Sequence, residues 1–274
     1  MKKNNAPVIP LTAVHIIHKE LLQPYNPVNI NLIGAGGTGS QMLTALARMS
    51  QALNGLNHPG FRVTLFDDDT VQAPNLARQL FTTAELGQYK SAALINRINR
   101  FFGLNWKAET ERYDKQNCSI AQGMAPITIS CVDTVKARFE IAEILNSYKK
   151  NSASHRDKPL YWLDFGNSKD TGQVILSTIG DIRQPVSKQF APQANLPFVT
   201  DEFKDLLIAS EMGDHTPSCS LAEALAKQDL FINSTLVNFG ASLIWQMFRE
   251  GILFHRGLFL NLKEYRTQPL KISA

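Results

Sequence analysis

A glycine-rich segment is the first feature of this sequence that could do chemistry. Gly34, Gly36 and Gly39 stand in the order G-x-G-x-x-G, with Gly37 between them. An apolar, β-rich run ends directly before the segment, and a stretch with the apolar spacing of a helix follows it. Glycines between a strand and a helix let backbone N–H groups approach a phosphate at the positive end of the helix. The segment therefore predicts a phosphate-binding loop, although a tight turn without a ligand fits the same glycines.

A carboxylate follows the next predicted strand. Residues 61–66 form an apolar, β-rich run that ends at Asp67. Dinucleotide-binding folds place an acid at this point, where it accepts hydrogen bonds from ribose hydroxyls. Asp67 lies farther from the glycine loop than the usual interval of about 20 residues, and the polar loop at residues 54–60 accounts for the excess. We therefore expect Asp67 to bind the ribose of a nucleotide.

Further polar residues lie where the same crevice is expected. Asn75, Arg78 and Gln79 come shortly after the second strand, Lys90 follows on a predicted helix, and Asp133 ends a later strand. Two cations suit the phosphates of a nucleoside triphosphate, and a carboxylate suits its Mg²⁺. Each residue also has a structural interpretation, because the cations could be surface charges and the carboxylate a helix cap. Their grouping around one glycine loop favours the triphosphate.

The three cysteines exclude two kinds of stabilising site. Cys118, Cys131 and Cys219 are scattered and form no CxxC pair. Neither a four-cysteine zinc site nor a disulfide framework is therefore expected, and a reducing, cytoplasmic compartment fits. Cys131 falls within a predicted strand and is expected in the core.

Composition and charge exclude several protein classes. The chain of 274 residues is 44% hydrophobic and 19% charged, with a net charge of +4, which is typical of a folded globular protein. The mild charge and the absence of a long basic run argue against a nucleic-acid partner. Residues 230–248 carry no charge but contain six polar side chains, which predicts a buried helix instead of a membrane span.

Strand-like and helix-like segments alternate along the chain, which predicts a Rossmann-like, doubly wound and mostly parallel α/β sheet. The predicted strands are residues 28–33, 61–66, 106–113, 127–132, 160–165 and 173–179, and the predicted helices are residues 40–53, 83–102 (with Thr83 as N-cap) and 134–148. We expect one domain over residues 1–274. Its parts are a nucleotide-binding core over 28–180 and a C-terminal region over 181–274, with a crossing loop that holds a short helix at 201–210, a long helix at 221–249 and a closing hairpin of strands 253–262 and 265–272.

Five motifs occur in a combination that is far more specific than the glycine loop alone. They are residues 34–40, Asp67-x-Asp69-Thr70-Val71, Asn75-Leu76-x-Arg78-Gln79, Gly87-Gln88-x-Lys90 and Cys131-x-Asp133. Together they resemble the ThiF/MoeB/HesA family, the adenylating fold shared with ubiquitin-activating enzymes. The resemblance covers residues 28–140 and continues more weakly through residues 172–174 and Cys219. Within this family, the sequence looks most like the ThiF homologue of the plasmid-borne PRTRC cassette.

The resemblance implies an activity and a role for each matching residue. Such enzymes bind ATP and Mg²⁺ and adenylate the C-terminal carboxylate of a small ubiquitin-like β-grasp protein of the ThiS/MoaD kind. Asp67 would hold the ribose, Asn75, Arg78 and Lys90 the phosphates, and Asp133 the Mg²⁺. Cys219 matches the sulfur nucleophile of some members, and a homodimer is implied.

The sequence departs from the family pattern at three points. The zinc-binding CxxC pairs of many relatives are missing, so no structural zinc is expected. Pro74 stands where relatives often have Ser, in a loop that tolerates it. No Arg precedes Arg48, so that Lys19 would have to take the place of an arginine that reaches a partner's nucleotide.

Three other functions remain open at this point. An NAD(P)-dependent oxidoreductase would use the same glycine loop but leaves Arg78 and Lys90 without a clear role. A non-catalytic ThiF-like interaction module of a plasmid system would show no pyrophosphate exchange. The tRNA-modifying branch of the family would require a basic tract, which the sequence lacks.

Overall fold

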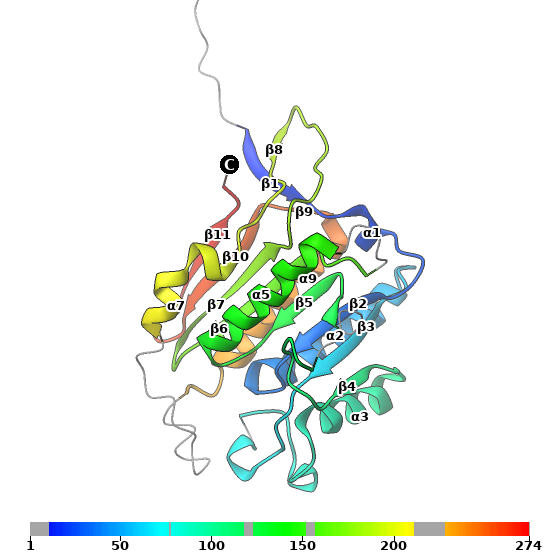
Figure 1. Ribbon diagram of the computed structural model, residues 1–274, viewed down its shortest axis with the longest axis vertical. Helices are drawn as coiled ribbons and strands as arrows, with labels where there is room; N and C mark the ends of the chain where they lie inside the picture. The colour runs from blue at the N-terminus through cyan, green and yellow to red at the C-terminus, as the bar shows by residue number, and fades with distance from the viewer. Residues whose placement is uncertain (1–10, 77, 118–122, 152–156, 211–227, 274) are drawn as a thin grey trace, which may run out of the picture.

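The computed structural model describes residues 11–76, 78–117, 123–151, 157–210 and 228–273. Its centre is an eight-stranded sheet in the order β11-β10-β7-β6-β5-β2-β3-β4 (Figure 1). The strands of this sheet are β2 (Val28–Ile33), β3 (Phe61–Phe66), β4 (Lys107–Glu109), β5 (Ile127–Ser130), β6 (Tyr161–Asn167), β7 (Thr171–Thr178), β10 (His255–Asn261) and β11 (Arg266–Lys271). This arrangement confirms the predicted Rossmann-like α/β fold.

The direction of the strands divides the sheet into two parts. The strands from β4 to β6 run parallel to one another, whereas β7, β10 and β11 are added as antiparallel neighbours. The chain order reverses at β2, because β3 and β4 lie on one side of it and β5 and β6 on the other. In an open α/β sheet such a reversal leaves a crevice at the carboxyl ends of the two strands that flank it. Here those strands are β2 and β5.

Helices cover both faces of the sheet (Figure 1). The longer helices are α2 (Gly37–Asn54), α3 (Lys90–Phe102), α5 (Val135–Asn151) and α9 (Ile232–Glu250), and the short ones are α1 (Lys19–Leu22), α6 (Val199–Glu202), α7 (Lys204–Ser210), η1 (Ala73–Asn75) and η2 (Thr83–Glu85). Helices α2, α3 and α9 contribute to one hydrophobic core, and α5, α6 and α7 contribute to the other. Alternate side chains of β6 pack into the two cores on opposite faces of the sheet. Leu163 and Phe165 pack into the first core, and Trp162 packs into the second. This is the period-2 pattern of a strand that is buried on both faces.

A second, smaller sheet joins the first strand of the described chain to two short strands of the C-terminal region. It consists of β8 (Phe190–Pro192), β1 (Thr12–Ile16) and β9 (Ile252–Leu253), in that order. The predicted crossing loop therefore contributes a strand to this sheet and, through α6 and α7, a cover for the large one. The predicted closing hairpin is confirmed as β10 and β11.

Two helix predictions were wrong in extent. The helix expected over residues 83–102 begins at Lys90, because Gly87 adopts a left-handed conformation (φ 81°) and separates it from η2. Thr83 is consequently not an N-cap, and Thr82 caps η2 instead. The helix expected from residue 221 begins at Ile232 within the described part of the chain. Asp229 accepts the backbone N–H of Phe231 at 2.7 Å and turns the chain directly before this helix.

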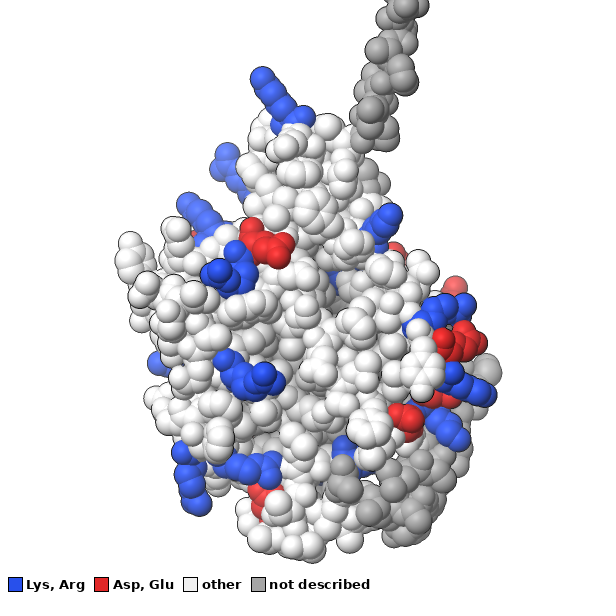
Figure 2. Space-filling view, turned by 180° about the vertical axis from the view of Figure 1, so that it is seen from behind, with Lys and Arg blue, Asp and Glu red and all other residues white. Residues whose placement is uncertain are grey.

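The surface on the side of α2 and α9 carries few charges. Figure 2 shows this face, where isolated Lys and Arg side chains stand among uncharged residues. None of the described helices combines the length and hydropathy that a membrane crossing needs. Residues 230–248, singled out by their lack of charge, form most of α9, and its inner side is buried in the core.

Candidate functional site

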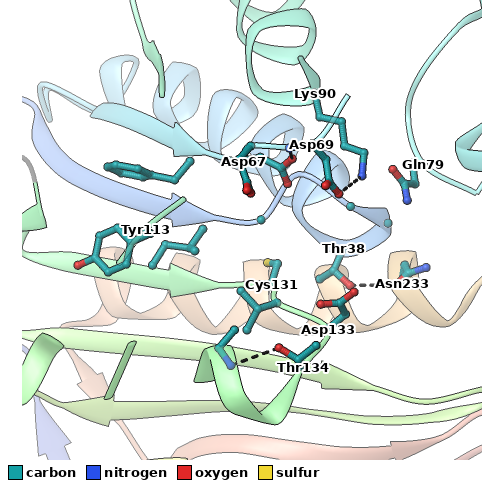
Figure 3. Close-up of a pocket in the computed structure, with 18 of the residues that line it drawn as sticks. Thr38, Asp67, Asp69, Gln79, Lys90, Tyr113, Cys131, Asp133, Thr134 and Asn233 are labelled. Atoms are coloured by element: carbon teal, nitrogen blue, oxygen red, sulfur yellow. Dashed lines mark hydrogen bonds and ion pairs between the residues drawn. The ribbon is translucent and has the colours of Figure 1, made fainter. Parts of the chain in front are cut away.

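A cavity lies in the crevice at the carboxyl ends of β2 and β5 (Figure 3). It encloses about 410 Å³ and is lined by the glycine loop, the end of β3 and the start of α3, together with the segment after β5 and the start of α9. At this point Cys131 donates its backbone N–H to the Ile33 carbonyl oxygen at 2.8 Å, which is the last link between the two strands. Both strands end at this hydrogen bond, and the segments that follow them line the cavity.

The glycine loop needs its glycines for two different reasons. Gly34 has a φ of 93°, and a Cβ there would stand 2.7 Å from the Cys131 carbonyl oxygen. A Cβ at Gly39 would overlap the carbonyl oxygen of Gly34, so that both positions hold the loop against β5 and α2. At Gly36, by contrast, nothing lies within 4 Å of a Cβ, and this residue faces the open cavity. The first turn of α2 has no side-chain cap, which leaves its N–H groups for a ligand.

One end of the cavity is apolar. The side chains there include Ile33, Phe66, Tyr113, Val132 and Ile141. The rings of Phe66 and Tyr113 are in edge-to-face contact, with centroids 5.1 Å apart, and Tyr113 Oη donates to a backbone carbonyl oxygen at 2.8 Å. A flat heterocycle fits such a wall, because aromatic and aliphatic side chains exclude water on both sides of it.

The other end carries cations and unpaired polar atoms. Lys90 is 6% exposed, and its Nζ lies 2.7 Å from Asp69 Oδ2. Arg78 Nη1 donates to Gln228 Oε1 at 2.7 Å. Arg78 Nε and Gln79 Oε1 are buried and have no hydrogen-bond partner among the described residues. Because buried polar atoms are nearly always hydrogen-bonded, these two atoms indicate a polar ligand.

Asp67 lies between the two ends. Its Oδ2 accepts the backbone N–H of Ala35 at 2.6 Å, and its Oδ1 accepts that of Asp69 at 3.1 Å. Burial raises the pKa of Asp67 to about 6, against the opposing effects of the Ala35 hydrogen bond and the Lys90 charge. The same carboxylate therefore shapes the glycine loop and remains available for further hydrogen bonds.

Asp133 lies across the cavity from the glycine loop. It is exposed, lines the cavity and follows the end of β5. The side chain that caps α5 is that of Thr134, whose Oγ1 accepts the backbone N–H of Ala137 at 3.2 Å. The described residues contain no group of three or more metal-binding side chains. This donor set fits a cation such as Mg²⁺ only together with a ligand's phosphates, which is the usual mode of this ion.

A buried ion pair supports this part of the site from behind. Arg138 Nε donates to both oxygens of Asp164, at 2.9 and 2.8 Å, and both side chains are almost fully buried. The Arg138 Nη2 also donates to the carbonyl oxygens of Val132 and Phe165. Burial raises the pKa of Asp164, and the Arg138 charge opposes that effect. The pair thus fixes the ends of β5 and β6, directly before Asp133.

The structure brings most of the predicted residues to one place. Those that line the cavity are Gly34, Gly36, Gly37, Asp67, Arg78, Lys90 and Asp133. Gly39 lies behind the loop, where it packs against Gly34. Cys131, expected in the core, also forms part of the cavity wall. Cys219 lies outside the described residues.

Asn75 is the predicted site residue that the structure places elsewhere. Its Oδ1 accepts the backbone N–H of Gln72 at 2.9 Å in a capping box of η1, and it is not part of the cavity lining. A short polar side chain within a turn often bonds to the local backbone in this way. The predicted contact of Asn75 with a phosphate stays a prediction.

Sequence reasoning assigned no role to several polar residues of the cavity. They include Thr38, Arg112, Asn167, Gln228 and Asn233. Two of them come from a segment near α9, far from the glycine loop in the chain. The one signal in the sequence was a polar side chain within an otherwise apolar helix, because such a residue needs a hydrogen-bonding partner when it is buried.

Solved structures with the same fold include PaaA and the MccB protein of E. coli. The PaaA structure shares 14% identity, with a TM-score of 0.58, and the match covers 93% of this chain and 66% of that one. The structure of E. coli MccB with ATP shares 13% identity, with a TM-score of 0.57 and the same coverage of both chains. This chain thus spans just under two thirds of the length of these structures, and at such low identity the likeness shows the fold. No curated protein matches the sequence.

The model of one protein family matches the sequence directly. It is the model of the ThiF family, and it covers residues 11–212. The matched region includes the glycine loop, β3, α3 and the segment after β5, and therefore most of the cavity wall. The sequence motifs, the strand order and this match agree, and the chain belongs to the ThiF family.

Proposed function

We propose that this protein is an ATP-dependent adenylating enzyme that acts on the C-terminal carboxylate of a small ubiquitin-like β-grasp protein. The observation that carries the proposal is the two-ended cavity, with an aromatic wall at one end and two buried or half-buried cations at the other. This layout fits the base and the phosphates of ATP. NAD carries less charge and leaves the cations and the unpaired atoms of Arg78 and Gln79 without a role.

The reaction would form one bond and break one. A carboxylate oxygen attacks the α-phosphorus of ATP, the bond from that phosphorus to the bridging oxygen breaks, and pyrophosphate leaves with both electrons. The carboxylate is already ionised near neutral pH, so no protein base is needed. Catalysis then consists of positioning and of neutralising phosphate charge.

Each cavity residue has a role in this scheme. Lys90 and Arg78 would stabilise the charge that develops on the leaving pyrophosphate. The loop at Gly36 leaves room for the phosphates to approach the N–H groups of α2. Asp67 would accept hydrogen bonds from the ribose. Asp133 would hold Mg²⁺, which supplies further charge neutralisation when bound to the phosphates.

The partner and the assembly are supported by the neighbouring structures and by one surface of the molecule. The titles of E. coli MccB structures name complexes with ATP and with MccA, which supports ATP and a partner molecule as substrates of this fold. The sparsely charged surface around α9 (Figure 2), where Phe231 and Phe239 are exposed, supports a homodimer. The assignment to the PRTRC-type ThiF homologues rests on the sequence resemblance.

A thioester step at Cys219 would follow adenylation. The thiolate attacks the carbonyl carbon of the acyl adenylate, a C–S bond forms, and AMP leaves. Cys219→Ala should retain pyrophosphate exchange and lose a thiol-sensitive covalent adduct with the partner in mass spectrometry of the denatured mixture. An adduct that persists in this variant would remove Cys219 from the scheme.

Pyrophosphate exchange tests the proposed function itself. Purified protein is incubated with ATP, Mg²⁺, labelled pyrophosphate and β-grasp proteins that end in Gly, including any encoded beside its gene. We expect label to enter ATP only when an intact C-terminal Gly is present. Calorimetry that finds NAD bound far more tightly than ATP with Mg²⁺ would overturn the proposal in favour of an oxidoreductase. ATP binding without exchange with any of these proteins would favour the non-catalytic module.

A further inference from the structure

A chain of hydrogen bonds connects the start of α9 to the phosphate end of the cavity. Asn233 is 2% exposed, and its Oδ1 accepts from Thr38 Oγ1 at 2.9 Å and from Asn167 Nδ2 at 3.1 Å. Its Nδ2 donates to Gln228 Oε1 at 3.2 Å, and the same oxygen accepts from Arg78 Nη1 at 2.7 Å. Thr38 belongs to the glycine loop, so one buried amide contacts both the loop and the residue that holds Arg78 (Figure 3 shows its bond to Thr38).

The direction of these hydrogen bonds is fixed by Arg78. A guanidinium group can only donate, so the Gln228 atom next to it must be the amide oxygen. That oxygen requires a donor from Asn233, which turns the Asn233 oxygen toward Thr38 and Asn167. The Thr38 hydroxyl then donates to Asn233. Every polar atom of the Asn233 amide is used once this orientation is set.

The glycine loop and Asn233 also fit each other in shape. A Cβ at Gly37 would stand 2.5 Å from Asn233 Nδ2, which is closer than such atoms approach. The absence of a side chain at Gly37 therefore lets the amide lie directly against the loop. The glycine pattern of the sequence placed Gly37 in a phosphate-binding loop, and the structure adds a second reason for its residue type.

We propose that Asn233 is a positioning residue for the phosphate end of the nucleotide site. It acts through Thr38 on the loop and through Gln228 on the Arg78 guanidinium, and it does not touch the nucleotide itself. This inference rests on the proposed function, because it assumes that the polar end of the cavity receives the distal phosphates of ATP. It implies that affinity for the triphosphate depends on Asn233 and that affinity for AMP depends on it much less.

Two substitutions separate positioning from a general effect on folding. Asn233→Ala removes the amide and leaves Gln228 and Thr38 without this partner. Asn233→Asp keeps the shape but replaces the Nδ2 donor by an acceptor opposite Gln228 Oε1, and it adds a negative charge near the phosphates. A merely structural role would weaken the binding of ATP and of AMP to the same extent in both variants. The positioning role predicts a loss of affinity that is largely confined to ATP.

A matched control is available on α3. The Asn99 side chain forms two hydrogen bonds, both to the backbone of Trp106 at 2.9 Å, and it does not line the cavity. Asn99→Ala should lower the melting temperature about as much as Asn233→Ala does and leave the dissociation constants for both nucleotides unchanged.

The experiment measures binding of ATP with Mg²⁺ and of AMP to the full-length protein by calorimetry. We expect Asn233→Ala to lower the affinity for ATP on the order of tenfold, as loss of hydrogen bonds that orient a charged group does. Asn233→Asp should lower this affinity further, and the affinity for AMP should be nearly unchanged in both variants. Equal losses for ATP and AMP, wild-type ATP affinity in both variants, or a milder effect of Asp than of Ala would overturn the inference. Failure of the wild-type protein to bind ATP would instead refute the proposed function.

Discussion

Protonation of Asp67 is expected to weaken ATP binding as the pH falls from 7 to 5. Burial raises the pKa of this carboxyl to about 6, and only the ionised form offers its full capacity to accept hydrogen bonds from ribose hydroxyls. With this pKa, about 90% of Asp67 is ionised at pH 7 and about 10% at pH 5. If only the ionised form binds, the affinity for ATP falls about tenfold over this range.

The assay compares wild type with Asp67→Asn, whose side chain does not titrate and can still accept the Ala35 N–H. The dissociation constant of ATP with Mg²⁺ is measured from pH 5 to pH 8, and the ratio of variant to wild type removes the titration of ATP itself. We expect the ratio to fall toward one as the pH is lowered through about 6. Asp181→Asn, at an exposed site outside the cavity, serves as the control. A ratio that does not change with pH would refute the role of Asp67.

The same pKa predicts the sign of a stability effect. A carboxyl whose pKa is higher in the folded than in the unfolded chain binds its proton more tightly when folded. Its contribution to stability is therefore fully present below about pH 4 and is lost as the pH rises through about 6. The difference between 3.8 and about 6 corresponds to about 3 kcal/mol at most. The free energy of unfolding of wild type relative to Asp67→Asn should decrease by up to that amount between pH 4 and pH 7.

Three further predictions follow from the cavity wall and its support. Lys90→Met should lower pyrophosphate exchange by about 10²-fold, as loss of a charge that stabilises the transition state does, with little change in stability because its partner carboxylate is largely exposed. Gly39→Ala should lower the free energy of unfolding by about 2 kcal/mol through overlap with backbone, whereas Gly36→Ala should leave the melting temperature nearly unchanged and weaken ATP binding. Arg138→Met should destabilise the fold by about 3–5 kcal/mol, because it leaves a buried carboxylate unpaired, and the added change Asp164→Asn should restore part of this loss in chemical denaturation.

Controls and contrary results are specific to each of these predictions. Lys136→Met removes an exposed lysine on α5 and should leave exchange unchanged. Wild-type exchange in Lys90→Met would remove that residue from the phosphate site. Equal melting temperatures for the Gly39 and Gly36 variants would contradict the packing of the loop. If Asp164→Asn lowers the free energy of unfolding of Arg138→Met further, the two side chains do not act as a pair.

Local patterns in the sequence predicted most of the fold. The runs at residues 28–33 and 61–66 and the hairpin near the C-terminus were correct, because alternation and apolar spacing are set by neighbouring residues. The prediction of one helix over residues 83–102 was wrong at Gly87. The left-handed backbone of this glycine separates the short helix η2 from the start of α3. A glycine can extend a helix at modest cost or interrupt it, and tertiary contacts decide between the two.

The candidate site, like the fold, was predicted from the sequence only in part. Gly34, Asp67 and Lys90 follow strand ends or begin a helix within one alternating pattern, and parallel strands bring their carboxyl ends to the same edge, so sequence alone predicted that they meet. The sequence did not predict that Asn75 bonds to its own turn, because a short polar side chain can bond either to the local backbone or to a ligand.

The identity of the residues that close the phosphate end was decided by tertiary structure alone. Gln228 and Asn233 are about 150 residues or more from Arg78 along the chain, and no periodicity links positions so far apart. Their contact depends on how α9 packs beside α2 on one face of the sheet, which is determined by the shape of the whole core. The sequence by itself thus determined the fold class and the phosphate loop, whereas the polar network behind that loop exists only because the folded core places the start of α9 against Gly37.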